Sequence, residues 1–250
     1  MSHRLIIIGP SHYCEKSRWA LERAGIDFSE EGHPPFLHIR PVKRAGGTRT
    51  TPVLVTPDEV LDDSVKISKW ISKQPEIKWN PLGDTQEETN RIIELEVLFG
   101  GKLGKLSRIF TYYHLLPHKK LVLKCMQTST PKSEQQWFSW GYPLFSFLMK
   151  KGMNINKKSA ERAYKKLKEI MEEYESMADG DYFVGSRLTI ADIAFASLAG
   201  PLVLPDQYGS IVPSLDELPP ALYDIVQEFR NMTSGKRVLR LYEQFRAPNT

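Results

Sequence analysis

A short apolar run that stops at a glycine and continues as a helical pattern is the feature that most constrains the fold of this chain. Residues 5–8 are all aliphatic, as in a strand that is buried on both faces. Gly9 and Pro10 end this run. From Tyr13 onward, small and apolar residues recur at helical spacing until Gly25, a residue type that commonly ends helices. The segment therefore predicts a buried strand, a tight corner and a helix packed against a sheet.

Ser11 lies in this corner, at or just before the predicted start of the helix. A helix N-terminus offers unpaired backbone N–H groups and about half a positive charge, so it stabilises an anion or a thiolate. Serine is also a preferred N-cap residue. Two roles are therefore open for Ser11: a structural cap, or a hydroxyl that takes part in chemistry.

The spacing of Ser11-His12-Tyr13-Cys14 resembles the Cys-Pro-Tyr-Cys motif of glutaredoxins. Serine replaces the first cysteine of that motif, and His12 replaces its proline. Cys14 then falls at the position of the second cysteine, one turn into the helix. Ser11 and Cys14 are therefore candidate catalytic residues.

The cysteine count, the net charge and the lengths of the apolar runs limit the kinds of protein that this chain can be. Cys14 and Cys125 are the only two cysteines, too few for a disulfide framework, which favours a reducing compartment such as the cytoplasm. The net charge of +4 is too small to indicate nucleic-acid binding, but it suits a small anionic ligand. No apolar run reaches the roughly 18 residues of a membrane helix, so no membrane span is expected.

Further strands and helical patterns complete the first 75 residues. A short second strand is followed by a less regular stretch over residues 32–50, which contains prolines and glycines. Residues 50–61 are typical of a β-hairpin, and Asp63 or Ser64 then caps an amphipathic helix. This order of elements matches the α/β thioredoxin-like fold.

The less regular stretch is rich in basic residues: Arg40, Lys43, Arg44 and Arg49. They are either the charges of a solvated loop or a basic rim that holds a carboxylate of a ligand. Under the second interpretation, Lys43 is a candidate ligand-binding residue.

Three motifs, in this order and spacing, make the chain similar to the cytosolic glutathione transferases. In serine-type members of that family, a serine at the position of Ser11 keeps its hydroxyl against the glutathione sulfur. Other branches use a tyrosine, so the resemblance makes Tyr13 a third candidate catalytic residue. The residue before a cis-proline, here Thr51 before Pro52, pairs its backbone with the cysteinyl part of glutathione. An acidic residue followed by serine, here Asp63-Ser64, holds the γ-glutamyl end. The resemblance therefore implies that these residues bind glutathione, which is a substrate rather than a resident cofactor.

The same resemblance implies a thioredoxin-like N-terminal domain followed by an all-α C-terminal domain. We expect the glutathione-binding domain over residues 1–75 and a proline-containing linker over residues 76–84. An all-helical domain then covers residues 85–250, with an aromatic insertion near residues 128–150 that departs from the family pattern. A capping box, Thr189 with Asp192, predicts a helix start in this domain, where the role of Asp192 is stability.

The helical pattern after the linker is interrupted by Gly100, Gly101 and Gly104, which suggests a bend or a close approach by another segment. In the family, the residues of this stretch that face the first domain line the pocket of the second substrate. By that analogy, the candidates in this chain are Arg108, Tyr112 and Tyr113, with core packing as the alternative.

The aromatic residues gathered over residues 137–149 have three possible roles: core, wall or lid of a pocket, and interface. His114 and His118 have the spacing of a metal pair, but Pro117 breaks the helix between them and no third ligand is near. No metal site is therefore expected.

The resemblance implies an enzyme that activates the glutathione thiol for attack on a hydrophobic electrophile, and a homodimer. Two alternatives stay open. One is a glutathione-dependent thiol transferase that uses Cys14, and the other is a non-catalytic protein that binds apolar ligands in the cleft between the domains.

Overall fold

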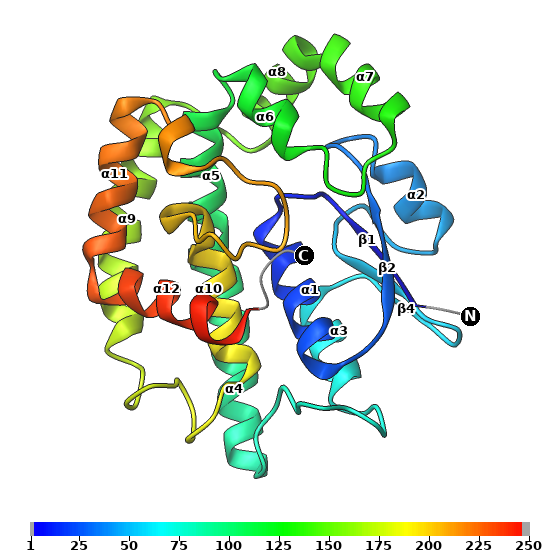
Figure 1. Ribbon diagram of the computed structural model, residues 1–250, viewed down its shortest axis with the longest axis vertical. Coiled ribbons are helices and arrows are strands. Elements are labelled where there is room, and N and C mark those ends of the chain that lie inside the picture. Colours follow the sequence, from blue (N-terminus) through cyan, green and yellow to red (C-terminus); the bar gives the residue numbers. More distant parts are fainter. Residues whose placement is uncertain (1–2, 247–250) are drawn as a thin grey trace.

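A four-stranded mixed sheet forms the centre of the N-terminal part (Figure 1). The computed structural model describes residues 3–246. The strands are β1 (His3–Ile7), β2 (Phe28–Gly32), β3 (Val53–Val55) and β4 (Val60–Leu61), in the spatial order β2-β1-β3-β4. Strand β1 pairs in parallel with β2 and antiparallel with β3, while β3 and β4 form the predicted hairpin. This topology fits the expected thioredoxin-like fold.

Successive side chains of β1 pack against different helices on the two faces of the sheet. Leu5 and Ile7 belong to the large core that includes helices α1 (His12–Ala24) and α3 (Ser64–Ile71). Ile6 points the other way and packs with Val42 of the short helix α2 (Ile39–Arg44). Because successive side chains of a strand face opposite sides, the aliphatic run fills both layers. The less regular stretch over residues 32–50, which the sequence leaves open as a loop or a helix, contains helix α2.

Helix α1 confirms the predicted strand, corner and helix. Its buried residues include Cys14 and Ser17, and Gly25 ends it with a left-handed φ of 73°. Glycine reaches this conformation without the steric cost that a Cβ atom brings.

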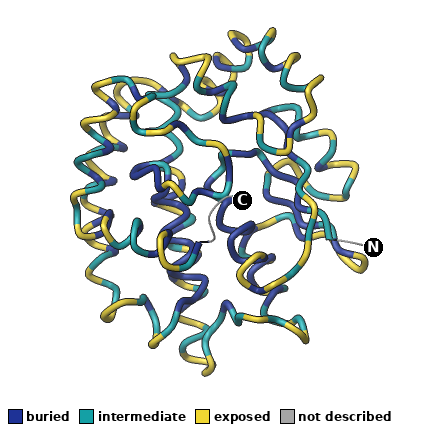
Figure 2. The backbone as a smooth tube through the Cα atoms, viewed as in Figure 1, coloured by how far each residue is buried: buried dark blue, intermediate teal, exposed yellow. Residues whose placement is uncertain are grey.

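The remainder of the chain is helical. Helix α10 (Ile190–Val203) lies in the middle and is buried at every position except Pro201 (Figure 2). The predicted capping box at its start is present: Asp192 accepts hydrogen bonds from the backbone N–H and the hydroxyl of Thr189, both at 2.8 Å. The other α-helices are α4 (Gln86–Phe99), α5 (Lys105–Leu115), α6 (Lys119–Cys125), α7 (Lys132–Trp140), α8 (Tyr142–Gly152), α9 (Lys157–Glu175), α11 (Pro220–Asn231) and α12 (Thr233–Phe245).

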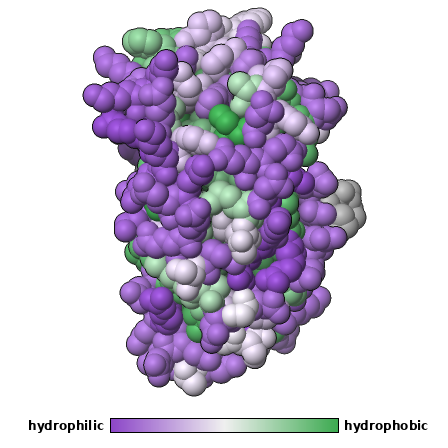
Figure 3. Space-filling model, turned by 90° about the vertical axis from the view of Figure 1, so that its left-hand side faces the viewer, coloured by the Kyte–Doolittle hydropathy of each residue, from purple (hydrophilic) through white to green (hydrophobic). Residues whose placement is uncertain are grey.

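Helices α9 and α11 form the outer side of the helical part. The Lys/Glu face of α9 is solvated, as its amphipathic pattern predicts, and the surface on this side is largely hydrophilic (Figure 3).

The glycine-rich interruption forms a π-helical turn, η1 (Gly100–Gly104), which joins α4 directly to α5. Such turns are rare and often mark functional sites. The sequence predicted a bend or close approach at this point, and the structure shows a close approach by the side chain of Tyr13.

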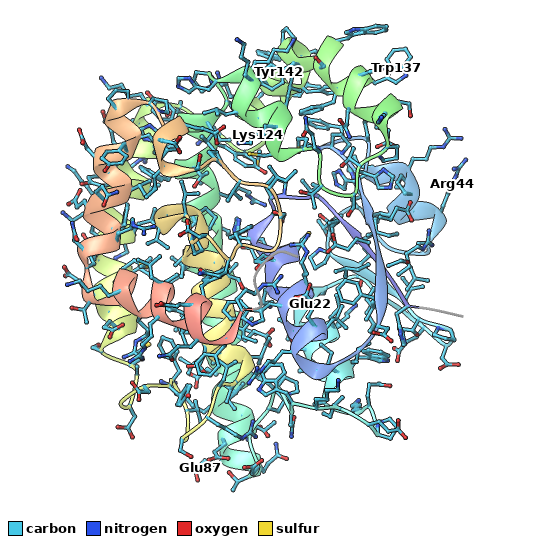
Figure 4. All side chains as sticks on the ribbon, in the orientation of Figure 1. Glu22, Arg44, Glu87, Lys124, Trp137 and Tyr142 are labelled. Carbon is cyan, nitrogen blue, oxygen red and sulfur yellow. The ribbon has the colours of Figure 1, made fainter. Side chains whose placement is uncertain are left out.

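The aromatic segment folds into helices α7 and α8 at one end of the molecule, where Trp137 and Tyr142 are labelled in Figure 4. Phe138 and Tyr142 are buried, but Trp137 and Trp140 are 64% and 76% exposed. The segment is therefore core on one side and solvent-exposed aromatic surface on the other.

Within residues 3–246, no helix is long and apolar enough to cross a membrane. The same residues contain no group of three or more His, Cys, Asp or Glu side chains that could hold a metal ion.

Candidate active site

A cleft of about 660 Å³ opens between the N-terminal sheet and helices α5 and α8. The N-terminal ends of α1 and α3 both reach it, as does the loop before β3. Six of the residues proposed for catalysis or glutathione binding line it together: Ser11, Tyr13, Thr51, Pro52, Asp63 and Ser64. Motifs that are far apart in the sequence therefore meet at one site.

Ser11 occupies the N-cap position of α1 with an extended backbone, yet its side chain makes no capping hydrogen bond. Its backbone is fixed instead, because its N–H donates to the carbonyl of Ile8 at 2.9 Å and its carbonyl accepts from Glu15 at 2.8 Å. No side chain caps the first N–H groups of α1, so the helix end keeps its partial positive charge at the cleft. The hydroxyl is thus placed where an anion is stabilised.

Cys14 lies beneath this corner and has no solvent exposure. Burial raises the pKa of its thiol, while hydrogen bonds from the side chains of Ser11 and Thr51 act in the opposite direction. The thiol does not line the cleft. A buried thiol with a raised pKa is a poor nucleophile, and this geometry favours a structural role.

The side chain of Tyr13 docks onto the π-helical turn. Its hydroxyl donates to the carbonyl of Gly100 at 2.7 Å, and burial raises its pKa. A Cβ atom at Gly104 would lie 2.7 Å from the Cζ atom of Tyr13, so only glycine leaves room for the ring. The hydroxyl is thereby engaged with the protein rather than free for a ligand.

His12 is a cleft residue to which the sequence assigned no role. Its Nε2 atom lies 2.9 Å from the carbonyl oxygen of Gly104, and because a carbonyl only accepts, Nε2 carries the proton. Burial lowers the pKa of His12 to about 4, so the ring is neutral at physiological pH.

The loop before β3 presents unpaired backbone to the cleft. The Thr51–Pro52 peptide bond is cis. Neither the N–H nor the carbonyl of Thr51 forms a hydrogen bond with any part of residues 3–246. An extended ligand could therefore pair with this residue as a strand does.

Asp63 and Ser64 stand at the start of α3. The Asp63 carboxylate accepts hydrogen bonds from the N–H groups of Val65 and Lys66, at 2.8 and 3.3 Å, and this confirms Asp63 as the cap. Ser64 is largely buried and lines the cleft. Helix α3 therefore adds a second N-terminus and a hydroxyl to the site.

The basic stretch contributes one side chain to the cleft, Arg49. Lys43, the residue proposed from the sequence, is exposed on α2 and does not line the cleft. His38 fixes the loop, because its ring lies 3.0 Å from the carbonyl of Arg49. Which basic residue faces the cleft depends on loop geometry that composition does not reveal.

Helices α5 and α8 form the opposite wall. Arg108 and Tyr112 line the cleft, together with Leu148 and Met149 of the aromatic segment. Tyr113 does not line it and borders a separate surface hollow. Behind the wall, a narrow apolar cavity of about 60 Å³ shares His12, Arg108 and Tyr112 with the cleft.

Comparison with protein families gives two matches. The family of glutathione S-transferase N-terminal domains matches residues 5–79, and the family of glutathione S-transferase C-terminal domains matches residues 123–231. The two matches together cover more than half of the chain. A comparison with curated protein sequences found no match.

Solved structures share the fold over the whole length. A glutathione transferase from Phanerochaete chrysosporium is 17% identical, covers 100% of this chain and 99% of its own, and has a TM-score of 0.61. A glutathione S-transferase from Methylobacterium radiotolerans, in complex with glutathione sulfonate, is 18% identical, covers 100% of this chain and 96% of its own, and has a TM-score of 0.52. Identities this low establish the common architecture alone.

Proposed function

This chain belongs to the glutathione S-transferase family, and on that premise we propose that it binds glutathione in the cleft and joins it, through its sulfur, to an electrophilic, hydrophobic substrate. The observation that carries the proposal is the uncapped hydroxyl of Ser11 at the N-terminus of α1, in one cleft with Thr51 and Ser64. The bound glutathione sulfonate of the Methylobacterium radiotolerans relative supports glutathione as the ligand.

Each part of the tripeptide finds a complementary group in this arrangement. The γ-glutamyl end meets the start of α3, with the Asp63 carboxylate for its amine and the Ser64 hydroxyl for its carboxylate. The cysteinyl backbone pairs with Thr51. The glycyl carboxylate lies toward the rim near Arg49.

The chemistry is thiolate formation followed by nucleophilic attack. The glutathione thiol releases its proton to solvent water. Ser11 donates a hydrogen bond to the resulting thiolate sulfur, and the end of α1 adds its positive field, so both favour the thiolate over the thiol. The sulfur electron pair then forms a C–S bond with the electrophilic carbon, and the leaving group departs with the electrons of the bond that breaks. An ordinary thiol has a pKa near 8.5, and each pH unit of lowering corresponds to about 1.4 kcal/mol.

Turnover by wild type and S11A, with glutathione and an aryl halide, tests the role of Ser11. The exposed Ser29 on β2 provides the matched control, S29A. We expect S11A to lose at least tenfold in kcat, since the Ser11 hydroxyl, which contacts the Cys14 thiol in the free chain, turns to the glutathione thiolate in the complex, and a hydrogen bond to a charged group is worth about 1.5–3 kcal/mol. The ultraviolet absorbance of bound thiolate should fall in parallel. Unchanged turnover in S11A would reject the role.

The thiol transferase that uses Cys14 is the second candidate. It predicts a mixed disulfide between Cys14 and glutathione, detectable by intact mass. The burial of this thiol opposes that outcome. Retention on immobilised glutathione without turnover of any electrophile would instead favour the non-catalytic binding protein.

Family membership also leads us to propose a homodimer in the cytoplasm. Light scattering on the purified chain tests the oligomeric state, and a mass of one chain would contradict it.

A further inference from the structure

Arg108 lies at the junction of the cleft and the narrow apolar cavity, and no residue that the structure describes pairs with its charge. Its Nε atom is buried and has no hydrogen-bond partner, and the guanidinium forms no ion pair with any residue from 3 to 246. The buried Arg18 and Arg246 behave differently, because both pair with Glu15. Arg108 is therefore not explained by a structural salt bridge.

The groups around Arg108 supply no negative charge. It interacts electrostatically with His12, Tyr13 and Tyr112, all of which are neutral because burial lowers the pKa of the histidine and raises the pKa of both tyrosines.

The carboxylates that line the cleft are engaged elsewhere. Asp62 pairs with Lys66 at 2.8 Å, and Asp63 caps α3. A partly buried cation without a counter-charge is unfavourable, and it becomes favourable when a ligand supplies the anion.

The narrow cavity next to Arg108 indicates that the rest of such a ligand is apolar. Its walls are almost entirely apolar, and they include Leu115, Leu116, Val122 and Met126. A guanidinium presents a planar pair of donors that matches a carboxylate. The site thus offers one charged contact at the mouth of an apolar chamber.

We propose that Arg108 selects a second substrate that carries a carboxylate next to an apolar body. The carboxylate pairs with the guanidinium, and the apolar body lies against Met149 and extends toward the narrow cavity. This inference rests on the proposed function, which assigns the other end of the cleft to the two carboxylates of glutathione.

Calorimetry on the full chain, saturated with glutathione, tests the proposal with an unreactive pair of ligands: phenylbutanoate and its methyl ester. We expect wild type to bind the acid at least tenfold more tightly than the ester, and R108M to lose this preference. R108K should retain part of it, since the charge remains without the planar fork. Lys102, an exposed cation of the adjoining π-helical turn that lines neither the cleft nor the narrow cavity, provides the matched control, and K102M should keep the preference.

Two results would overturn the assignment. One is an equal preference for the acid in wild type and R108M. The other is a weaker affinity of R108M for glutathione itself with the acid preference intact, which would make Arg108 a glutathione ligand. R108Q replaces R108M if the latter does not fold. Neither probe is an electrophile, so the binding test does not depend on turnover. A chain without transferase activity would contradict the proposed function, and the calorimetry would still decide the role of Arg108.

Discussion

The hydroxyl of Tyr13 donates a hydrogen bond of 2.7 Å to the carbonyl oxygen of Gly100, across the junction between α1 and the π-helical turn. His12 makes the neighbouring contact, with Nε2 at 2.9 Å from the carbonyl of Gly104. Two consecutive residues of the first turn of α1 therefore dock on one glycine-rich turn. Because that turn continues directly into α5, the docking fixes Ser11 relative to Arg108 on the opposite wall.

The close fit at Gly104 leads to the first prediction. G104A should lower the free energy of unfolding by about 1–3 kcal/mol, because the added methyl group overlaps the ring of Tyr13. G101A is the matched control, since a Cβ atom at Gly101 meets nothing within 4 Å. Replacing a helical glycine by alanine should leave stability unchanged or raise it by up to about 1 kcal/mol. Urea titration measures both, and equal stabilities would contradict the fit.

The second prediction concerns the hydroxyls of Ser11 and Tyr13. Y13F removes the part-buried hydrogen bond to Gly100 and should cost about 0.5–1.5 kcal/mol of stability, the usual net contribution of one intramolecular hydrogen bond. With glutathione and an aryl halide as substrates, the kcat of Y13F should stay at least tenfold higher than the kcat of S11A. The reverse order of the two variants would make Tyr13 the residue that meets the sulfur.

Local signals explain why much of the fold was predictable from the sequence. The strand, corner and helix of residues 5–25 depend on neighbouring residues, as does the capping box of Thr189 and Asp192. The sequence could not distinguish helix α2 from a loop, because the helix is only six residues long, contains Pro41 and has no side-chain cap. Such a helix forms through tertiary packing, here of Val42 on the sheet.

The walls of the site were harder to predict than its corner. Tyr112 and Tyr113 differ by one position, about 100° around a helix, and the preceding π-helical turn shifts the helical phase. The sequence alone therefore could not decide which tyrosine faces the cleft. The same limit applies to His12, whose partner Gly104 lies 92 positions away.

The third prediction is a pH dependence of stability that comes from His12. Its pKa is lowered by burial from 6.5 to about 4, so between these values the unfolded chain binds the proton and the folded chain does not. Stability should therefore fall as the pH falls from 6.5 to 4, by an amount on the order of 3 kcal/mol for this residue. H12Q keeps a donor for Gly104 but does not titrate. Urea titrations of both proteins across this range should give a shallower slope for H12Q, and parallel slopes would contradict the assignment.

The fourth prediction concerns the buried ion pair between Lys16 on α1 and Glu96 on α4. Nζ and Oε1 are 2.7 Å apart, the two side chains are 2% and 0% exposed, and Ser68 on α3 donates to the same oxygen at 2.8 Å. K16M leaves an uncompensated buried carboxylate and should lower the free energy of unfolding by about 3–5 kcal/mol.

The double variant K16M/E96L separates the value of the ion pair from the cost of breaking it. It removes both charges, and Ser68 keeps the carbonyl of Ser64 as an acceptor at 2.9 Å. An apolar pair of similar volume is often as stable as the ion pair that it replaces, so the double variant should recover most of the loss. Chemical denaturation of wild type, both single variants and the double variant gives the coupling energy. A double variant no more stable than K16M would show that the ion pair itself stabilises the contact between α1 and α4.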